Sequence, residues 1–355
     1  MMKDIRQKGR DSFTILSAVL ALSLLLFIIP AFGLTSCQRE VPDDLVLKEK
    51  DSLMIKIKLK SPEKKNLRSI DVFFFNNDEL KRLDSYQRFQ APIDGILDLA
   101  SRKGEKIIAI LANCSADRFT WAGISSYESL KSAIKELKDE NPESPAMSGE
   151  CRLKAMDKGE ISLEIEALMA EIELQSLGFD FSSIQQGSVK VTEVKAYITN
   201  VNASSPLLYE DTFSVGSIIN YGRAVPSEYE NFLHPEIIFR NIADDVGDGL
   251  IRPKARFYCY ENESEQIDLG RPGTRLVIEA KLNGEKYYYP IEVNREGFGL
   301  TGGKPGIKRN KRYVYNIIIS RFGTKDPDIP AKSETMNIDL KIEDWRSIDE
   351  EIISY

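Results

Sequence analysis

Few side chains in this 355-residue chain have the types and spacing that catalysis requires. His234 is the only histidine, and the sequence 232–235, ending in proline, predicts a loop around it. A single imidazole base therefore stands without the G-x-S-x-G motif that would supply a nucleophile. We expect no enzyme activity and no catalytic residue. A deep pocket converging on His234 would be the observation that favours an enzyme.

Two further segments could bind ions. Asp244, Asp245 and Asp248, next to two glycines, could hold calcium through their carboxylates, but their spacing does not fit an EF-hand loop. We interpret them as a polar turn. The glycines between residues 297 and 306 lie between two predicted strands, so no helix N-terminus follows to bind a phosphate. We expect neither a metal site nor a cofactor.

Cys37 follows an N-terminal segment whose residue order is typical of an export signal. Four basic residues near the start are followed by the apolar run 13–34 and then by the small residues before Cys37. This order resembles a bacterial lipoprotein signal. The resemblance implies a cut between Ser36 and Cys37, and acyl chains such as palmitate on the lipidated Cys37, which anchor the protein to a membrane. The alternative is a plain transmembrane anchor, although Pro30 and Gly33 interrupt the apolar run.

The remaining cysteines do not indicate a disulfide framework. Cys114, Cys151 and Cys259 are odd in number and show no C-x-x-C spacing, and no cysteine lies near His234 to form a zinc site. Cys114 ends an apolar strand, which favours a small buried thiol.

The charge balance excludes one class of partner. Without residues 1–36 the formal charge changes from 48 − 55 = −7 to 44 − 53 = −9. A net acidic chain lacks the basic surface that nucleic acid requires, so we expect no nucleic-acid partner. The mature length of roughly 320 residues predicts two domains.

The chain from residue 52 onward is dominated by short runs with the period of two that half-buried strands show. Asn283-Gly284 predicts a two-residue hairpin. One amphipathic helix is expected over 125–138, with Ser125 and Glu128 as a capping box. The expected strands are 53–59, 70–75, 96–99, 106–113, 151–154, 161–174, 189–198, 236–239, 254–260, 276–282, 286–293, 313–319 and 336–341.

Two surface patterns have ordinary interpretations. Glu164, Glu166, Glu171 and Glu173 alternate along the run 161–174, which is typical of a sheet face in contact with solvent. The tyrosines at 287–289 could stack on sugar rings, but a strand that presents them alternately to core and surface accounts for them equally well.

Several segments, in the same order along the chain, resemble the fimbrillin family, the type V pilus subunits of Bacteroidales. The match departs from the family pattern where glutamates and Met169 replace the usual basic residues of the long strand. The matching segments are the lipobox 34–37, the strands 69–76, 106–113 and 165–174, the helix 125–138, Met147-Ser148-Gly149, Tyr288–Asn294, Arg309-Asn310-x-x-Tyr313, Gly323-Thr324-x-x-Pro327 and Glu343-x-Trp345.

The resemblance implies an all-β fold with two tandem β-sandwich domains, the first transthyretin-like and carrying the short helix. We expect a signal peptide at 1–36, a tether at 37–51, and domains at 52–175 and 176–355, with the donor-strand tail in the second domain. The family assembles by donor-strand exchange after a trypsin-like protease removes the first strand. Here 53–59 would be that strand. The candidate cleavage residues are Lys64, Lys65 and Arg68, and the candidate donor-strand residues are Met336, Ile338, Leu340 and Ile342.

The expected function is therefore a structural or adhesive pilus subunit on the outer-membrane surface, in a fimbrium. Its expected partners are other copies or paralogous subunits, the outer membrane through the lipid, and host or bacterial surface ligands. Two alternatives remain open: an outer-membrane glycan-binding lipoprotein, which clustered exposed tyrosines and tryptophans would indicate, and a base anchor of the same pilus that does not polymerise.

Overall fold

The computed structural model describes residues 52–61, 66–91, 95–154, 159–184, 188–209, 216–246, 249–263, 272–299 and 304–345. The described residues belong to one compact unit. The expected signal peptide, Cys37 and the tether lie outside the described residues, as do Lys64 and Lys65. Within the described part of the chain, no helix has the length and apolar character needed to cross a membrane.

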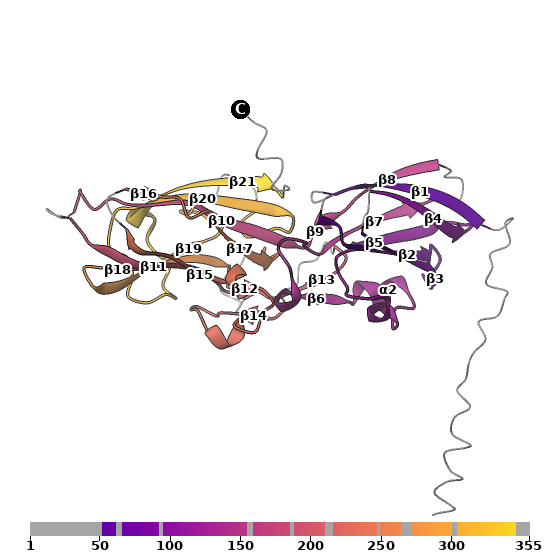
Figure 1. Cartoon of the computed structure of the whole chain (residues 1–355), viewed down its shortest axis with the longest axis horizontal. Coiled ribbons are helices and arrows are strands. Elements are labelled where there is room, and N and C mark those ends of the chain that lie inside the picture. Colours follow the sequence, from indigo (N-terminus) through magenta and orange to yellow (C-terminus); the bar gives the residue numbers. More distant parts are fainter. Residues whose placement is uncertain are drawn as a thin grey trace, which may run out of the picture. The chain divides into compact units, whose positions relative to one another are not determined.

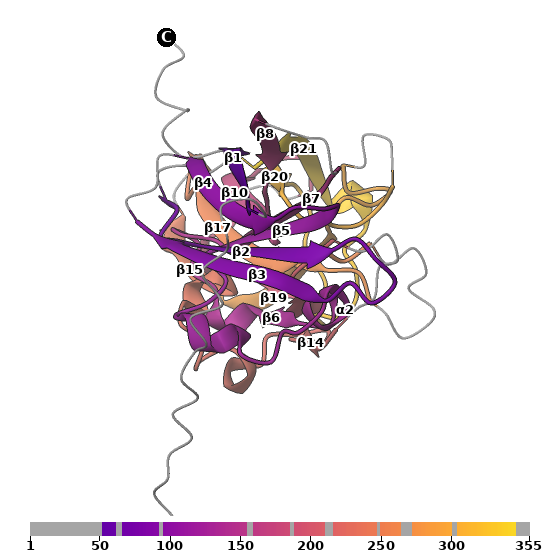
Figure 2. The same cartoon turned by 90° about the vertical axis from the view of Figure 1, so that its right-hand side faces the viewer.

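The first half of this unit is a β-sandwich of two sheets (Figures 1 and 2). One sheet has the order β4-β1-β8 and the other the order β3-β2-β5-β7-β9. The strands are β1 (Ser52–Lys60), β2 (Ser69–Asn76), β3 (Leu83–Gln90), β4 (Ile96–Arg102), β5 (Lys106–Ala112), β7 (Met147–Leu153), β8 (Gly159–Glu164) and β9 (Glu166–Ala167).

The strand β2 shows why this half needs a third layer. Residues Ile70–Phe75 are fully buried, so both faces of β2 are covered, as its mostly apolar sequence requires. The one charged side chain among them, Asp71, pairs with Arg88. Phe73 packs edge-on against Trp121 of the 3₁₀ helix Arg118–Trp121, at 5.7 Å between ring centroids. Phe75 meets Tyr127 of the helix α2 (Tyr127–Lys131) at the same distance. The helical segments therefore cover one face, while the sheet that contains β1 covers the other (Figure 1).

The second half is also a sandwich, again with two layers in Figure 1. One sheet has the order β16-β10-β20-β21, with β17 paired to the same edge of β10 as β16, and the other has the order β15-β11-β18-β19. The strands are β10 (Met169–Phe179), β11 (Val191–Thr199), β15 (Phe239–Val246), β16 (Leu250–Ile251), β17 (Ala255–Tyr260), β18 (Arg275–Leu282), β19 (Glu285–Glu292), β20 (Lys311–Ile319) and β21 (Met336–Asp344). The predicted all-β fold with two sandwiches is confirmed.

Two small sheets complete the unit. The strand β12 (Val201–Asn202) pairs with β14 (Ile218–Ile219). The strand β6 (Ile134–Glu136) of the first half pairs with β13 (Ser204–Pro206) of the second. The two sandwiches are therefore joined by main-chain hydrogen bonds as well as by the chain that connects them.

The prediction of one continuous strand over 161–174 is wrong. The chain forms β8, β9 and β10 there, with breaks at Ile165 and Leu168. The amide of Ile165 donates to the carbonyl of Lys60 at 2.9 Å, and the amide of Leu168 donates to that of Ala146 at 2.9 Å. The main chain thus changes partners twice, from the sheet of β1 to that of β7 and then to the second sandwich. The expected domain boundary after residue 175 falls inside β10.

The helix predicted over 125–138 is much shorter than expected. It ends at Lys131, and its N-cap is Ser126, which forms a capping box with Ser129 rather than the expected pair of Ser125 and Glu128. Ile134 and Leu137, which the prediction placed on the apolar face of the helix, lie outside it. Residues 134–136 pair with β13, and Leu137 is buried in a 3₁₀ turn. Pairing with a distant strand therefore overrides the local helical pattern.

Two other elements differ from the sequence prediction. The strand expected over 236–239 begins only at Phe239, because Pro235 starts a 3₁₀ turn over Pro235–Ile237. The strand β3 was not predicted, since its residues are mostly polar and only half-buried. The Asn283-Gly284 hairpin is confirmed: Leu282 pairs with Glu285, and both turn residues have positive φ, 52° and 87°.

Candidate strand-exchange site

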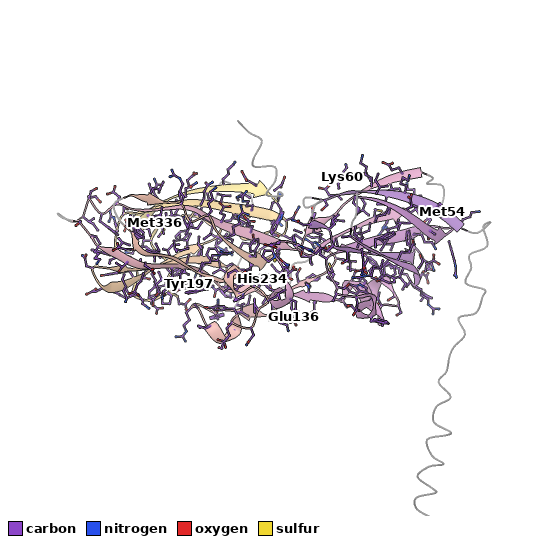
Figure 3. All side chains as sticks on the ribbon, viewed as in Figure 1. Met54, Lys60, Glu136, Tyr197, His234 and Met336 are labelled. Carbon is purple, nitrogen blue, oxygen red and sulfur yellow. The ribbon has the colours of Figure 1, made fainter. Side chains whose placement is uncertain are left out.

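The strand β1 lies in the middle of its sheet, with a neighbour on each side. It pairs antiparallel with β4, from Ser52↔Arg102 to Lys58↔Ile96. It pairs parallel with β8, from Ile55↔Gly159 to Lys60↔Glu164. Figure 3 labels Met54 and Lys60 near its two ends. Loss of β1 would therefore remove two ladders at once and leave a gap one strand wide.

The side chains of β1 alternate as the sequence predicts. Ile55, Ile57 and Leu59 are at most 3% exposed, whereas the lysines between them lie outside the core. Burying one aliphatic side chain of this size contributes about 1.5–3 kcal/mol. The ion pair of Lys56 with Asp98, at 3.7 Å between exposed groups, adds little by comparison. The gap would thus be lined by the apolar surface that these three side chains cover.

The segment between β1 and β2 contains the candidate cleavage residues. Of these, only Arg68 is described, and its side chain is exposed. Its neighbours Leu67 and Ser69 are 4% and 7% exposed. The structure thus brings Arg68 to the surface directly before β2 begins.

The candidate donor segment forms β21, the edge strand beside β20, with Met336 labelled at its start in Figure 3. Its nine residues pair antiparallel with β20 from Ile319↔Met336 to Lys311↔Asp344. Met336 and Leu340 are 6% exposed, and Ile338 and Ile342 are half-buried, so the predicted alternation is present.

Comparison with solved structures identifies the fold. A fimbrilin (FimA) from Porphyromonas gingivalis matches with a TM-score of 0.64 and 15% identity over 84% of this chain and 99% of that chain. A candidate cell adhesion protein from Bacteroides eggerthii matches with a TM-score of 0.61 and 15% identity over 83% and 96%. The tip fimbrial protein Mfa3 from P. gingivalis, with a C-terminal truncation, matches with 0.51 and 12% over 83% and 100%.

The chain has the fimbrilin fold. Comparisons with family models and with curated proteins found no match, so the likeness is visible in the structure and not in overall sequence similarity. The matched structures are described as fimbrial or cell adhesion proteins and not as enzymes, in agreement with the lack of a catalytic motif in the sequence.

The contacts of the Met147-Ser148-Gly149 segment of β7 explain why each of its three residue types is needed. Met147 is fully buried, and a Cβ on Gly149 would lie 2.1 Å from the carbonyl oxygen of Glu164. Ser148 accepts a hydrogen bond from Nη2 of Arg309 in the second sandwich, at 2.9 Å. The segment therefore fills the core, leaves room for the last residue of β8 and joins the two sandwiches. The sequence indicated this segment and the segment that begins at Arg309, but not the contact between them.

The glutamates of β10 correct the sequence interpretation. Glu171 and Glu173 do not face solvent, because they are 6% and 2% exposed. Arg256 of β17 lies 3.4 Å from a carboxylate oxygen of each, and Arg312 of β20 pairs with both. Burial raises the pKa of Glu171, while the two arginines oppose that shift. Glu164 is exposed and Glu166 is half-buried, so the solvent-facing interpretation holds only at that end.

Sequence reasoning also missed the buried carboxylate of Glu140. Glu140, which is 2% exposed, accepts hydrogen bonds from the Tyr260 hydroxyl at 2.8 Å and from the Ala146 amide at 3.2 Å. Burial raises the pKa of Glu140, and the charge of Lys135 opposes the shift. Because Tyr260 belongs to β17, this contact also joins the two halves.

The remaining sequence candidates do not converge on a common site. The imidazole ring of His234 is hydrogen-bonded to Glu236, with Nδ1 2.9 Å from the carboxylate oxygen Oε1. A cavity of about 410 Å³ lies elsewhere, around Ser148, Tyr209 and Arg309. Asp244 and Asp245 lie exposed on β15, Asp248 lies outside the described residues, and no cluster of metal ligands occurs among the residues that are described.

The aromatic and cysteine side chains mostly serve packing. Both tryptophans, Trp121 and Trp345, are buried, and Tyr289 is in the core while Tyr287 and Tyr288 are half-buried. Neither tryptophan can therefore belong to an exposed aromatic cluster of the kind that would favour glycan binding. Cys114 is buried as predicted, and none of the three cysteines in the described part of the chain forms a disulfide. These three are Cys114, Cys151 and Cys259.

Proposed function

We propose that this chain is a structural or adhesive subunit of a cell-surface fimbria, assembled by strand exchange at the site that β1 occupies. The observation that carries the proposal is the place of β1 between β4 and β8, together with the fimbrilin fold. A strand that enters such a gap gains main-chain hydrogen bonds on both edges and buries alternate side chains in preformed pockets. No other side-chain chemistry among the described residues points to a competing function.

The retained strand also explains how the subunit stays monomeric before assembly. An open gap between two strands exposes unpaired amides and carbonyls, which invite pairing with another chain. While β1 is present, both neighbours are paired. Removal of β1 after a cut in the segment that contains Arg68 would then switch the subunit from closed to receptive.

The incoming strand in this proposal is β21 of another copy or of a paralogous subunit. An edge strand leaves its sheet by breaking a single ladder, here the one with β20. Met336, Ile338, Leu340 and Ile342 recur at every second position, the same spacing as Ile55, Ile57 and Leu59 of β1. The proposal includes export of the chain as a lipoprotein that is lipidated at Cys37. The subunit would then be located in a fimbrium on the outer membrane surface.

A reversible cross-link between β1 and β4 tests the proposal. The amide of Leu59 donates to Gly95 at 2.7 Å, which makes 59↔95 a hydrogen-bonded pair, and alternation then makes Lys56↔Asp98 a non-hydrogen-bonded pair. Cα atoms of such pairs lie roughly 4.5 Å apart, within reach of a disulfide. The variant Lys56→Cys with Asp98→Cys, in a Cys151→Ser background without residues 1–37, can therefore retain β1 after cleavage.

The cut wild-type protein is expected to form ladders on native gels. The oxidised double variant should be cut equally but stay monomeric, and a reducing agent should restore its ladders. Lys56→Cys alone, treated identically, controls for the lost ion pair and should polymerise in both redox states. Ladders from the oxidised, fully cut double variant would contradict the proposal, as would persistent monomers after β1 has dissociated.

A further inference from the structure

The exposed side chain of Arg68 contrasts with its main chain, which is fully bonded. The Arg68 amide donates to Oδ1 of Asn113 at 2.9 Å. Its carbonyl oxygen accepts a hydrogen bond from the Ala91 amide at 2.9 Å. Arg68 thus offers a protease its charged side chain, but not a main chain that is ready to bind.

The residue after Arg68 is held by the same asparagine. The Ser69 amide also points to Oδ1 of Asn113, at 3.3 Å, and the Ser69 carbonyl accepts from the Asn113 amide at 3.0 Å. Both polar groups of the peptide bond between Arg68 and Ser69, the carbonyl and the amide, are therefore already in use.

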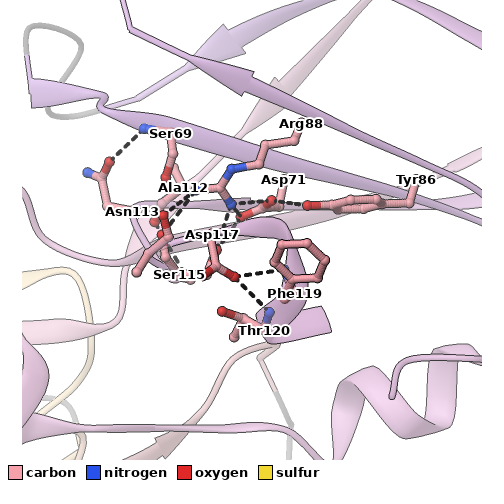
Figure 4. Close-up of polar contacts among 12 residues, drawn as sticks. Ser69, Asp71, Tyr86, Arg88, Ala112, Asn113, Ser115, Asp117, Phe119 and Thr120 are labelled. Carbon is pink, nitrogen blue, oxygen red and sulfur yellow. Dashed lines mark hydrogen bonds and ion pairs between the residues drawn. The ribbon is translucent and has the colours of Figure 1, made fainter. Parts of the chain in front are cut away.

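Asn113 also holds two segments through its side-chain amide. Its Nδ2 donates to the carbonyl oxygens of Asn66 and Pro145, each at 3.1 Å. Its φ of 57° lies in the left-handed region, which asparagine tolerates better than most residues. Figure 4 shows Asn113 beside Ser69, close to the Asp71, Arg88 and Ser115 contacts that fix the next residues of the chain.

Hydrolysis of this bond adds water, leaving a carboxylate on Arg68 and an amino group on Ser69. A trypsin-like protease must receive the Arg68 carbonyl oxygen in its oxyanion hole. That oxygen is occupied by Ala91 in the folded subunit, so the bond must first leave the sheet. Such local opening has its own free energy, and proteolysis follows the population of the open form when opening is fast.

We propose that Asn113 is a latch that keeps the Arg68–Ser69 bond resistant to cleavage in the folded subunit. This inference rests on the proposed function, because it specifies how strand removal is controlled. Asn113 acts as a positioning residue: it sets how often the bond opens and takes no part in the hydrolysis itself. The rate of cleavage at Arg68 is then a property of this chain as well as of the protease.

The test compares Asn113→Gly with a matched variant elsewhere. Glycine adopts positive φ without strain, so the substitution removes the latch and preserves the backbone. Asn283 has a φ of 52°, accepts a hydrogen bond from the Lys190 amide at 2.9 Å and donates its own amide to the Lys190 carbonyl at 2.9 Å. Asn283→Gly thus removes a similar clamp far along the chain from Arg68.

An arginine-specific protease is applied to the folded protein, and the new N-terminus at Ser69 is followed by mass spectrometry. Asn113→Gly should be cut about ten-fold faster than the wild type, since a hydrogen bond of this kind typically corresponds to several-fold in an opening equilibrium. Hydrogen exchange of the Arg68 and Ser69 amides should accelerate in parallel. Asn283→Gly should accelerate the Lys190 amide and leave the rate at Arg68 unchanged.

Asn113→Asp supplies the conservative variant, because it keeps the acceptor for Arg68 and Ser69 but loses the donor to Asn66 and Pro145. Its cleavage rate should lie between those of the wild type and Asn113→Gly. Equal rates for wild type and Asn113→Gly would overturn the latch, as would wild-type Arg68 and Ser69 amides that exchange at unfolded rates. These outcomes are independent of polymerisation, so a cut protein that fails to form ladders refutes the proposed function alone.

Discussion

At the scale of single residues, asparagines with positive φ recur at the ends of strands in this chain. Asn113, Asn283 and Asn310 all combine a left-handed backbone with a side chain that accepts a hydrogen bond from the main chain of a distant segment. Asn310 accepts from the Ala167 amide at 3.3 Å and donates its own amide to Met169 at 3.0 Å, so it holds both sides of the break at Leu168. These residues fix where strands end and where the chain changes sheets.

The buried charges of β10 lead to a prediction about stability. Arg312→Met should destabilise the fold by roughly 3 kcal/mol, because it leaves Glu173 buried with only Arg256 as a partner. Adding Glu173→Gln should recover part of the loss. Lys341→Met, which removes an exposed lysine beside Glu343, is the matched control and should change stability by less than about 0.5 kcal/mol. Urea unfolding at neutral pH measures all three, and an Arg312→Met as stable as the control would contradict the prediction.

Glu140 leads to a prediction about pH. Its pKa in the folded protein is raised by burial, so between its ordinary and its folded pKa the folded state retains a proton that the unfolded state releases. Its contribution to stability therefore falls as pH rises through this interval. Glu140→Gln removes the titration but also disturbs the contact with Ala146, so the informative quantity is the difference from wild type.

That difference should shift in favour of Glu140→Gln as pH rises above the ordinary glutamate range, measured by urea unfolding at several pH values. The groups facing Glu140 are the Tyr260 hydroxyl, Lys135, the Cys114 thiol and the main-chain amides of Ala146 and Asn141, none of which changes in the variant. A difference that is constant from acidic to neutral pH would show that the carboxyl group of Glu140 titrates normally.

Cys37 carries the residue-scale prediction about export. Labelled palmitate fed to cells should enter the wild-type chain and not Cys37→Ala, because the proposed acylation needs this sulfur. Ser36→Ala, which keeps a small residue before the cut, should still be labelled. Equal labelling of wild type and Cys37→Ala would exclude lipidation at this position.

At the scale of elements, Gly149 sets how closely β7 can approach the end of β8. Gly149→Ala should cost about 1–3 kcal/mol, because the new Cβ would meet the main-chain oxygen of Glu164, which cannot move without disturbing β8. Gly123→Ala is the control, since nothing lies within 4 Å of its Cβ position. Thermal unfolding of both variants tests the difference, and equal midpoints would contradict it.

The elements also show what the sequence could predict and what it could not. The alternation in β1 and β21 gave the correct strands, since each buries one face and exposes the other. The helix over 125–138 and the solvent face of Glu171 and Glu173 were wrong for a common reason. In both cases the partner is a distant strand, β13 for Ile134 and β17 or β20 for the glutamates, and local spacing carries no information about it.

The candidate strand-exchange site was predictable only in part. The order of the motifs indicated the candidate first strand, the candidate donor strand and the segment with Arg68, and their roles stay predictions. The latch at Asn113 was not predictable, because residues 66–69 and 145 come together only through the pairing of β5 with both β2 and β7. The sequence places an asparagine at the end of an apolar strand, which is an ordinary turn signal.

At the scale of the whole molecule, a lock between β20 and β21 tests which segment is donated. The amides of Trp345 and Ser320 donate to Asn310 and Thr335, which makes 310↔345 and 320↔335 hydrogen-bonded pairs. Alternation makes Lys311↔Asp344 a non-hydrogen-bonded pair that a disulfide can join. If β21 is donated, the oxidised variant Lys311→Cys with Asp344→Cys should be cut normally yet form no ladders.

Reduction of that variant should restore the ladders, and Lys311→Cys alone should behave like the wild type. A truncation after Trp345 provides the second comparison, because it preserves all of β21 and its buried residues. Deletion from Ser333 does not, since it removes Met336 and Leu340 from the core and is expected to unfold the second sandwich. Ladders that persist in the oxidised lock but vanish on truncation after Trp345 would assign donation to residues 346–355 and leave β21 a fixed part of its own sheet.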